Sequence, residues 1–387
     1  MPFAQLVVGF TSLIIWLYLA VARGMFWRVR DFDDDTARHE PPSAWPRVIA
    51  VVPARNEAAG IQQCVASLLR QNYPGEFAVI VVDDHSEDAT AQLAQQAACD
   101  SGAESRIKIR RAAPLPAGWT GKLWALHEGM SHADAAGPAY YWFTDADIVH
   151  APDTLQRLVA RAERDKLDLT SLMVLLQAKT LPERALIPAF LFFFLKLYPP
   201  RWIAAPRART AGAAGGCILL RSEALQRIGG LGTIRGEVID DCALARAVKR
   251  SGGKIWMGLT RASVSLRVYT TFAEIRDMIA RTAFTQLRYS PALLLGTVIG
   301  MFLTYLAPVA LIFAPGVTPR VLGVCAWGLM CLLYLPTLRF YSRSLLWASL
   351  LPAVAAFYSY GTILSALRFW RGRGGQWKGR SQAEHER

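Results

Sequence analysis

Sulfur-based metal sites and glycine-rich phosphate loops are both missing from this sequence. The six cysteines form no C-x-x-C pair and have no metal-like spacing, so they fit buried thiols in a reducing compartment. The first predicted strand is followed by neither a G-x-G-x-x-G turn nor a G-x-x-x-x-G-K-[ST] loop. These absences argue against a dinucleotide-binding domain and a P-loop enzyme, because each needs its loop to approach phosphates.

Acidic residues are fewer than basic ones: 30 Asp and Glu stand against 43 Lys and Arg, for a formal charge of +13. Much of the basic excess follows the first and last apolar runs, at Arg23, Arg28, Arg30, Arg368, Arg371, Arg373, Lys378 and Arg380. Basic residues beside membrane spans hold those loops in the cytoplasm and attract anionic headgroups. We therefore expect a lipid bilayer, and no nucleic acid, as the partner of this charge.

Long uncharged runs contribute to a hydrophobic fraction of 53%. Four of them, at residues 3–22, 291–319, 321–338 and 345–367, have roughly the length needed to cross about 30 Å of hydrocarbon. The first could instead be a cleaved signal peptide, since residues 20–22 resemble a cleavage site. However, no basic residue precedes this run, and it is longer than a typical signal core. We predict four transmembrane segments.

Between residues 46 and 289, short apolar runs alternate with amphipathic stretches, which is typical of a sheet built from βα units. We predict strands at 48–52, 77–82, 106–110, 140–143, 169–177, 217–220 and 254–259, and helices at 58–70 and 88–99. The sequence thus predicts an α/β fold in four parts. These are an N-terminal anchor (1–30), an α/β domain (45–290), C-terminal transmembrane helices (291–370) and a basic tail (371–387).

The segment 185–195 is wholly uncharged but too short to span a bilayer, and it contains three consecutive phenylalanines, Phe192 to Phe194. It is either a buried core helix or a helix in the membrane interface, where Tyr198 and Trp202 would suit an aromatic belt. The sequence leaves both interpretations open.

Four acidic clusters lie at or beyond the ends of predicted elements: Asn56-Glu57, Asp83-Asp84, Asp145-Ala146-Asp147 and Asp240-Asp241. In an open α/β sheet the ligand crevice lies beyond the carboxyl ends of the strands, so carboxylates placed there converge on one site. We expect that site to hold a cation and a sugar nucleotide.

Each cluster has an ordinary structural alternative. Asp83-Asp84 could hold a uracil or ribose, or could cap a helix that begins near Asp88. If Asp145 and Asp147 lie on one face of a strand, both carboxylates reach one divalent ion bridging two phosphates, although a lone D-x-D is a common accident. Asp240-Asp241 is either a helix N-terminal pair or a general base over the site.

Other segments offer contacts to a nucleotide or its phosphates. Residues 53–57 carry groups that hydrogen-bond a base or ribose. Lys122, in Gly-Trp-Thr-Gly-Lys, supplies a cation for a diphosphate unless it is simply solvated. The pair Gly215-Gly216 allows a ligand to approach the backbone, or forms a tight turn.

A predicted capping box at Thr271 and Glu274 opens a helix on which Arg281, Thr285 and Arg288 share one face. That face is either a basic wall for phosphates or a surface that contacts lipid headgroups.

These segments together resemble the inverting family 2 glycosyltransferases, and more closely the hopanoid-biosynthesis-associated membrane glycosyltransferases, which are related to ceramide glucosyltransferases. The resemblance is carried by V-V-P-A-R-N-E-A (51–58), L-P-A-G-W-T-G-K-L-W-A (115–125), T-D-A-D-I-V-H-A-P (144–152), A-A-G-G-C-I-L-L-R (213–221), I-D-D-C-A-L-A-R-A (239–247) and T-Q-L-R-Y-S-P (285–291). It runs from about residue 45 to beyond 310, and its ordered combination is highly specific.

The resemblance implies a GT-A type fold, an α/β nucleotide-diphospho-sugar transferase domain, and a role for each matching residue. Asp241 would be the catalytic base, and Asp145 and Asp147 would hold Mg²⁺ or Mn²⁺ at the diphosphate. The donor, by expectation a UDP-sugar, would be bound by Pro53, Arg55, Glu57, Asp84, Lys122, Asp145 and Arg288. Tyr289 and Gly216 would contact the acceptor.

Membrane synthases of the wider family carry Q-x-x-R-W after the base, whereas this chain reads Thr285-Gln286-Leu287-Arg288-Tyr289. The resemblance therefore favours a single transfer to a membrane lipid, a hopanoid or related polycyclic lipid, over processive polysaccharide synthesis. The sequence also leaves open a nucleotidyltransferase and a catalytically silent membrane scaffold.

The expected location is the bacterial inner membrane, with several spans and a cytoplasmic catalytic domain. Three full C-terminal crossings would then place the basic tail outside, so we hypothesise that one apolar segment, 345–367, is re-entrant or interfacial.

Overall fold

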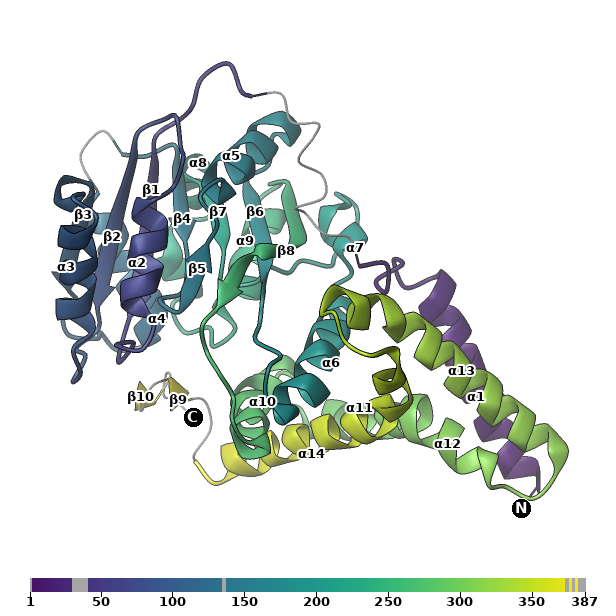
Figure 1. Cartoon of the computed structure of the whole chain (residues 1–387). Helices are drawn as coiled ribbons and strands as arrows, with labels where there is room; N and C mark the ends of the chain where they lie inside the picture. The colour runs from purple at the N-terminus through teal and green to yellow at the C-terminus, as the bar shows by residue number, and fades with distance from the viewer. Residues whose placement is uncertain (1, 30–40, 134–136, 373–375, 378–379, 382–387) are drawn as a thin grey trace. The chain divides into compact units, whose positions relative to one another are not determined.

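The computed structural model describes residues 2–29, 41–133, 137–372, 376–377 and 380–381, and it separates by contact into two units (Figure 1). The sheet unit comprises residues 30–177, 202–267 and 376–387. The helical unit comprises residues 1–29, 178–201 and 268–375. Residues 178–201 and 268–290, predicted within the segment 45–290, therefore group with the apolar helices. The functional division into four parts stays a prediction.

An eight-stranded mixed sheet organises the sheet unit, in the order β3-β2-β1-β4-β7-β6-β8-β5. Its strands are β1 (Val48–Ala54), β2 (Phe77–Asp83), β3 (Ile107–Arg111), β4 (Tyr140–Phe143), β5 (Ile148–His150), β6 (Leu169–Leu175), β7 (Ile218–Arg221) and β8 (Ile255–Ser265). The β1 pairs with β2 and β4 are parallel, as are β2–β3 and β6–β8, whereas β7 runs antiparallel to β4 and β6, and β5 runs antiparallel to β8.

Strand β1 is buried along its whole length because helices cover both of its faces. On one face, Val48, Ala50 and Val52 join a core with helices α2 (Ile61–Leu69), α3 (Thr90–Asp100) and α5 (Thr154–Asp165). On the other face, Val51 lies under helix α4 (Gly121–Ser131) at Gly129. A strand buried on both faces reads as a continuous β-branched run, as this one does.

The shorter elements complete the two units. They are η2 (Glu104–Arg106), α7 (Pro200–Ala204), α8 (Ser222–Arg227), η3 (Leu231–Ile234), α9 (Asp240–Arg250) and the small pair β9 (Gln376–Trp377) and β10 (Arg380–Ser381). Every predicted strand is present within a few residues, although β8 extends to Ser265.

One structural premise of the sequence analysis is wrong. Strand β4 ends at Phe143, and Asp145 to Asp147 form the turn before β5, a strand that was not predicted. The two carboxylates therefore do not share a strand face, and the alternation of side chains along a strand does not bring them together. Their proximity depends on the turn.

Within the part of the chain that the structure describes, four helices are long and apolar enough to cross a membrane, at Phe3–Val21, Pro291–Ile312, Val317–Phe340 and Leu345–Trp370. They contain α1 (Pro2–Val21), then α11 (Pro291–Met301), the π-turn η4 (Phe302–Leu306) and α12 (Ala307–Ile312), then α13 (Val317–Phe340), and finally η5 (Leu345–Leu350) with α14 (Leu351–Trp370). The four predicted apolar segments are thus confirmed as helices of spanning length.

Helix α6 (Leu181–Leu197) is a core helix of the helical unit. Phe192 is fully buried, with its ring centroid 5.2 Å from those of Phe26 and Tyr334. Phe193 packs edge-on against Tyr305 and a second tyrosine, Tyr358. The core interpretation of residues 185–195 is therefore the one that the packing supports.

The π-turn is stabilised by polar groups of α1. Pro308 has no N–H, so it cannot donate the usual helical hydrogen bond to the carbonyl of Thr304, four residues earlier. The indole Nε1 of Trp16 donates to this carbonyl at 2.7 Å, and Ser12 Oγ donates to the carbonyl of Leu303 at 2.6 Å. Freed backbone carbonyls in an apolar bundle need such partners, because no water replaces them.

Helix α10 (Phe272–Gln286) begins with the predicted capping box of Thr271 and Glu274 but ends earlier than expected. Arg288 and Tyr289 have left-handed backbone conformations, with φ of 53° and 55°, in the turn before α11. Arg288 therefore does not share a helix face with Arg281 and Thr285, which corrects the sequence analysis.

Helix α14 continues without a break through Gly361 and packs along α10. The Gly361 position accommodates Ile279, and Arg368 pairs with Asp277 at 2.6 Å. The helix is unbroken, and whether it lies across or along a membrane stays a prediction.

The contact between α4 and β1 predicts the effect of a small substitution. A Cβ at Gly129 would lie 2.4 Å from Val51 Cγ1 and 3.0 Å from Val82 Cγ2. We expect Gly129→Ala to lower the free energy of unfolding by about 1–3 kcal/mol through overpacking, although alanine favours helix intrinsically. Thermal unfolding of the full-length protein measures this. Ser131→Ala, exposed at the end of the same helix, should change stability by less than about 0.5 kcal/mol. Equal midpoints for Gly129→Ala and wild type would contradict this packing.

Candidate active site

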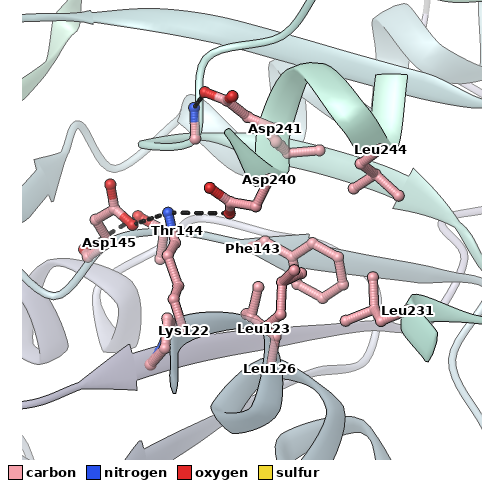
Figure 2. A pocket seen from close by; sticks show the side chains of 13 residues that line it. Lys122, Leu123, Leu126, Phe143, Thr144, Asp145, Leu231, Asp240, Asp241 and Leu244 are labelled. Atoms are coloured by element: carbon pink, nitrogen blue, oxygen red, sulfur yellow. Dashed lines mark hydrogen bonds and ion pairs between the residues drawn. The ribbon is translucent and has the colours of Figure 1, made fainter. Parts of the chain in front are cut away.

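A pocket of the sheet unit lies where β1 and β4 end and where α4 and α9 begin (Figure 2). Its polar wall is made of Lys122, Asp145, Gly215, Asp240 and Asp241, and its apolar wall includes Leu123, Leu126, Phe143, Leu231 and Leu244. Pro53 also lines the pocket. The crevice beyond the carboxyl ends of strands is where open α/β sheets bind ligands, as expected from the sequence.

Lys122 lies between two carboxylates from distant parts of the chain. Its Nζ is 2.8 Å from Asp145 Oδ1 and 3.4 Å from Asp240 Oδ2. Burial alone would lower the pKa of Lys122, but the charges of Asp145 and Asp240 outweigh it and raise the pKa. The solvated-lysine alternative is therefore not what the structure shows, and this position carries a fixed positive charge.

Asp241, in the first turn of α9, is held by two backbone N–H groups. Its Oδ2 accepts a hydrogen bond from Gly215 N at 2.9 Å, and its Oδ1 accepts one from Cys242 N at 2.6 Å. Burial and the neighbouring charge of Asp240 raise the pKa of Asp241 to about 6, against the opposing effects of Lys122 and these hydrogen bonds. A carboxylate with this pKa can accept a proton at neutral pH better than an ordinary aspartate.

Gly215 leaves the room that this arrangement needs. A Cβ at residue 215 would lie 3.1 Å from Lys122 Nζ and 3.4 Å from Asp241 Oδ2. Gly216 instead faces Val174 and Ile148, and its carbonyl accepts from Thr144 Oγ1 at 3.0 Å. Of the two glycines, Gly215 is therefore the one beside the charged groups.

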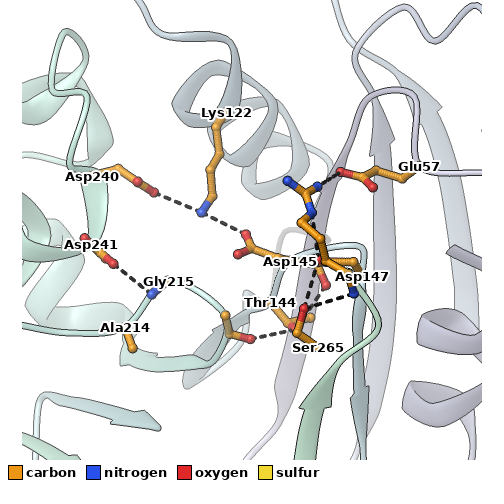
Figure 3. A network of polar contacts seen from close by, with 12 residues as sticks. Glu57, Lys122, Thr144, Asp145, Asp147, Ala214, Gly215, Asp240, Asp241 and Ser265 are labelled. Carbon is orange, nitrogen blue, oxygen red and sulfur yellow. Dashed lines mark hydrogen bonds and ion pairs between the residues drawn. The ribbon is translucent and has the colours of Figure 1, made fainter. Parts of the chain in front are cut away.

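Asp147 is held by Ser265 (Figure 3) and by Arg267. Arg267 Nε is 3.4 Å from Asp147 Oδ2, and Arg267 Nη2 is 3.3 Å from Glu57 Oε1. Burial, followed by the nearby charge of Asp145, raises the pKa of Asp147, while Arg267 and Ser265 act in the other direction. The two carboxylates of the D-x-D turn are thus close enough to repel each other.

These groups suit a divalent cation that is shared with a diphosphate. Lys122 pairs with Asp145 and Asp240, and Arg267 pairs with Asp147 and Glu57. With Asp241, these side chains carry a formal charge of −3 when all are ionised. Among the residues that the structure describes, no group of three or more His, Cys, Asp or Glu could hold a metal by itself. Mg²⁺ at phosphates commonly uses only one or two carboxylates, and the remaining ligands are phosphate oxygens and water. Asp145 and Asp147 fit that pattern.

The loops after β1 and β2 are joined through Arg55. Its guanidinium donates to the backbone carbonyls of Asp84 at 2.5 Å and His85 at 3.2 Å, and it lies 4.0 Å from the fully buried Asp84 carboxylate. Helix α3 begins after Ala89, without a side-chain cap, so Asp83-Asp84 does not cap it. The helix-cap alternative for this pair is therefore wrong.

A buried histidine stands behind the D-x-D turn. His150 Nε2 and Thr144 Oγ1 are 2.8 Å apart, and His150 Nδ1 is 2.8 Å from Ser263 Oγ. Burial lowers the pKa of His150 to about 3, so the imidazole is neutral and links β4, β5 and β8 through hydrogen bonds. The turn that carries Asp145 thus has a rigid support.

Sequence reasoning selected Pro53, Lys122, Asp145 and Asp241, and the structure brings all four to one pocket. Arg267 was not predicted from the sequence, where its only signal is its place just after the long strand β8. Arg288 and Tyr289 belong to the helical unit, where Tyr289 stacks on Phe369 at 4.4 Å, and their proposed roles stay predictions.

Residues 49–229 match the family model described as glycosyl transferase family 2. This segment, slightly less than half of the chain, is thus similar to the family 2 glycosyl transferases. The glycosyltransferase AglE of Haloferax volcanii is 40% identical over 55 residues, which are 14% of this chain and 18% of that relative. The chain therefore matches less than a fifth of the length of this curated relative.

A solved structure described as a mannosyltransferase from Pyrobaculum calidifontis, in complex with GDP-Man and Mn²⁺, covers 95% of this chain and 99% of its own. Its TM-score is 0.60 and its identity to this chain is 19%, a likeness that shows the fold. The family 2 domain therefore has the predicted GT-A type α/β fold, with apolar helices at both ends of the chain that are long enough to span a membrane.

The raised pKa of Asp241 predicts the acid limb of the glycosyltransferase pH profile. A base whose pKa is about 6 is ionised above that pH and protonated below it, so kcat/KM should fall about tenfold per unit below pH 6. Asp241→Asn should transfer sugar about 10²- to 10⁴-fold more slowly and lose this limb, while binding nucleotide nearly normally. An unchanged acid limb in Asp241→Asn, or an equal loss of donor affinity, would exclude Asp241 as the base.

Proposed function

We propose that this protein is an inverting glycosyltransferase that moves a sugar from a nucleotide-sugar donor to a hydroxyl group of a membrane lipid. The observation that carries this proposal is the position of Asp241. Its carboxylate, with a pKa raised to about 6, lines the same pocket as Asp145 of the D-x-D turn, and Lys122 pairs with Asp145 and with the neighbouring Asp240. A base and a diphosphate-binding group beside one pocket are what direct displacement at a sugar carbon needs.

In the proposed mechanism, Asp241 takes the proton from the acceptor hydroxyl as its oxygen attacks the anomeric carbon. The bond from that carbon to the phosphate oxygen breaks, and the nucleoside diphosphate leaves from the opposite face of the sugar, so the configuration inverts. Asp145 and Asp147 would hold Mg²⁺ or Mn²⁺, which would neutralise charge on the leaving diphosphate. Lys122 adds a fixed positive charge on the same side of the pocket.

The donor proposal rests on the loops at the ends of β1 and β2. We propose that residues 53–57, with Pro53, Arg55 and Glu57, contact the nucleoside together with Asp84. A UDP-sugar is the donor that the resemblance suggests. The GDP-Man in the Pyrobaculum calidifontis structure makes a GDP-sugar the second donor to test. Arg288 is proposed as a further phosphate contact.

The acceptor proposal rests on the four apolar helices and on the resemblance of six segments to hopanoid-associated enzymes. A polycyclic lipid must be glycosylated at the bilayer surface, and apolar helices on both sides of the catalytic sequence would keep the enzyme there. Tyr289 and Gly216 are proposed acceptor contacts. Because Tyr289 replaces the tryptophan of processive synthases, a single transfer is favoured over polymer synthesis.

The basic residues that follow the apolar runs support a cytoplasmic catalytic domain at the bacterial inner membrane. Under this topology the tail after α14 lies in the cytoplasm, provided that one C-terminal apolar segment does not cross completely.

Metal removal tests the D-x-D assignment. We expect EDTA to reduce transfer strongly, with activity restored by Mn²⁺ or Mg²⁺, because the uncompensated carboxylates would repel the diphosphate. Asp147→Asn should reduce transfer strongly even with added metal. The measurement is release of nucleoside diphosphate from several nucleotide sugars. Full activity in thoroughly chelated enzyme would overturn the assignment.

A comparison of acceptors tests the lipid proposal. The purified full-length enzyme should glycosylate detergent-dispersed hopanoids and leave water-soluble alcohols and peptides unmodified, as measured by mass spectrometry of the products. Asp241→Asn in the same detergent is the matched control for non-enzymatic transfer. Equal activity on soluble alcohols would contradict the lipid acceptor, and transfer of many sugars to one acceptor would favour processive synthesis.

A further inference from the structure

Each side-chain cation of the site contacts one proposed metal ligand and one further carboxylate. Arg267 lies between Asp147 and Glu57, at 3.4 Å and 3.3 Å, and it uses a different nitrogen for each contact. Lys122 has the corresponding place between Asp145 and Asp240. Both metal ligands are therefore already neutralised in part by the protein itself.

We propose that Arg267 is an internal counter-ion that neutralises Asp147 in the metal-free enzyme and remains with Glu57 when a divalent cation takes Asp147. This inference rests on the proposed function, since it takes Asp145 and Asp147 as the metal ligands. Arg267 is thus a positioning residue, which acts on the metal through Asp147 and does not contact the ion.

Several properties of the Arg267–Asp147 contact support a movement of Arg267 from Asp147 to Glu57. Arginine stays protonated, so Arg267 can release Asp147 only by moving away as a charged group. Its Nη2 already reaches Glu57, which gives the charge a second partner, and its side chain is 35% exposed, which leaves it room to move. Ser265 Oγ lies 3.2 Å from Asp147 Oδ2, so Asp147 keeps a donor when Arg267 moves.

In this proposal the metal competes with Arg267 for Asp147. The apparent affinity for the metal is therefore the intrinsic affinity multiplied by the fraction of molecules in which Arg267 has already released Asp147. The contact of Arg267 with Glu57, at 3.3 Å, is longer than a close charge-assisted hydrogen bond of about 2.7–2.9 Å, so it can shorten once Arg267 leaves Asp147. Glu57 then stabilises the released arginine more than the bound one, which increases this fraction. Removing Arg267 should therefore tighten metal binding, and removing Glu57 should weaken it. A purely electrostatic effect of the two charges on the metal would also tighten binding when Arg267 is removed and weaken it when Glu57 is removed. In that case, however, the effects of the two substitutions would add independently.

A double-mutant cycle separates the two explanations. Full-length wild type, Arg267→Gln, Glu57→Gln and the double variant are titrated with Mn²⁺ without a donor, and free Mn²⁺ is followed by electron paramagnetic resonance. We expect Arg267→Gln to tighten binding and Glu57→Gln to weaken it, each by about fivefold or more. In the Arg267→Gln background, Glu57→Gln should have little effect on the affinity for Mn²⁺, because there is no arginine for Glu57 to hold after release from Asp147.

Arg261→Gln, on the exposed face of strand β8, is the matched control, since it removes the same charge and should leave the affinity for Mn²⁺ within about twofold of wild type. Circular dichroism verifies that every variant is folded. Independent, additive effects of the two substitutions would overturn the inference, as would equal affinities of wild type and Arg267→Gln. If neither of these two proteins binds Mn²⁺, the metal site of the proposed function itself fails.

Discussion

Negative charge gathered at one edge of the sheet is the constraint on which the candidate site depends. Five carboxylates from three separate segments lie near two side-chain cations, Lys122 and Arg267. The fold offsets part of this cost with backbone dipoles, because Gly215 N–H and the first turn of α9 face Asp241. Burial, together with the neighbouring charge of Asp240, raises the pKa of Asp241.

The mixed sheet explains why such distant residues meet. Parallel strands β1 and β4 end at the same edge, so Pro53 and Asp145 line one pocket although they are far apart in the sequence. The antiparallel strand β7 begins at that edge and brings Gly215 just before it. Helices α4 and α9 then supply Lys122 and the Asp240-Asp241 pair from their first turns.

The sequence predicted what depends on local pattern. The β-branched run of β1 and the Thr271–Glu274 capping box were found because neighbouring residues determine them. Strand β5 was missed because three residues are too few to show a period. The carboxylates that contact Lys122 and Arg267 come together only when the sheet has formed, so no spacing in the sequence reveals these contacts. The sequence did not distinguish a core helix from an interfacial helix at α6, because an apolar run of that length suits both. The aromatic contacts of α6 support the core helix.

The hydrogen bond from Trp16 to the π-turn has a consequence for the order of biosynthesis. Its donor and acceptor are separated by 288 residues, so α1 leaves the ribosome long before the carbonyl that it will bind is made. At bacterial and eukaryotic rates of synthesis this delay is roughly 15 to 60 s. All residues of the eight-stranded sheet are synthesised within that interval. The catalytic sheet therefore has time to fold while α1 still lacks the carbonyl that its indole will bind.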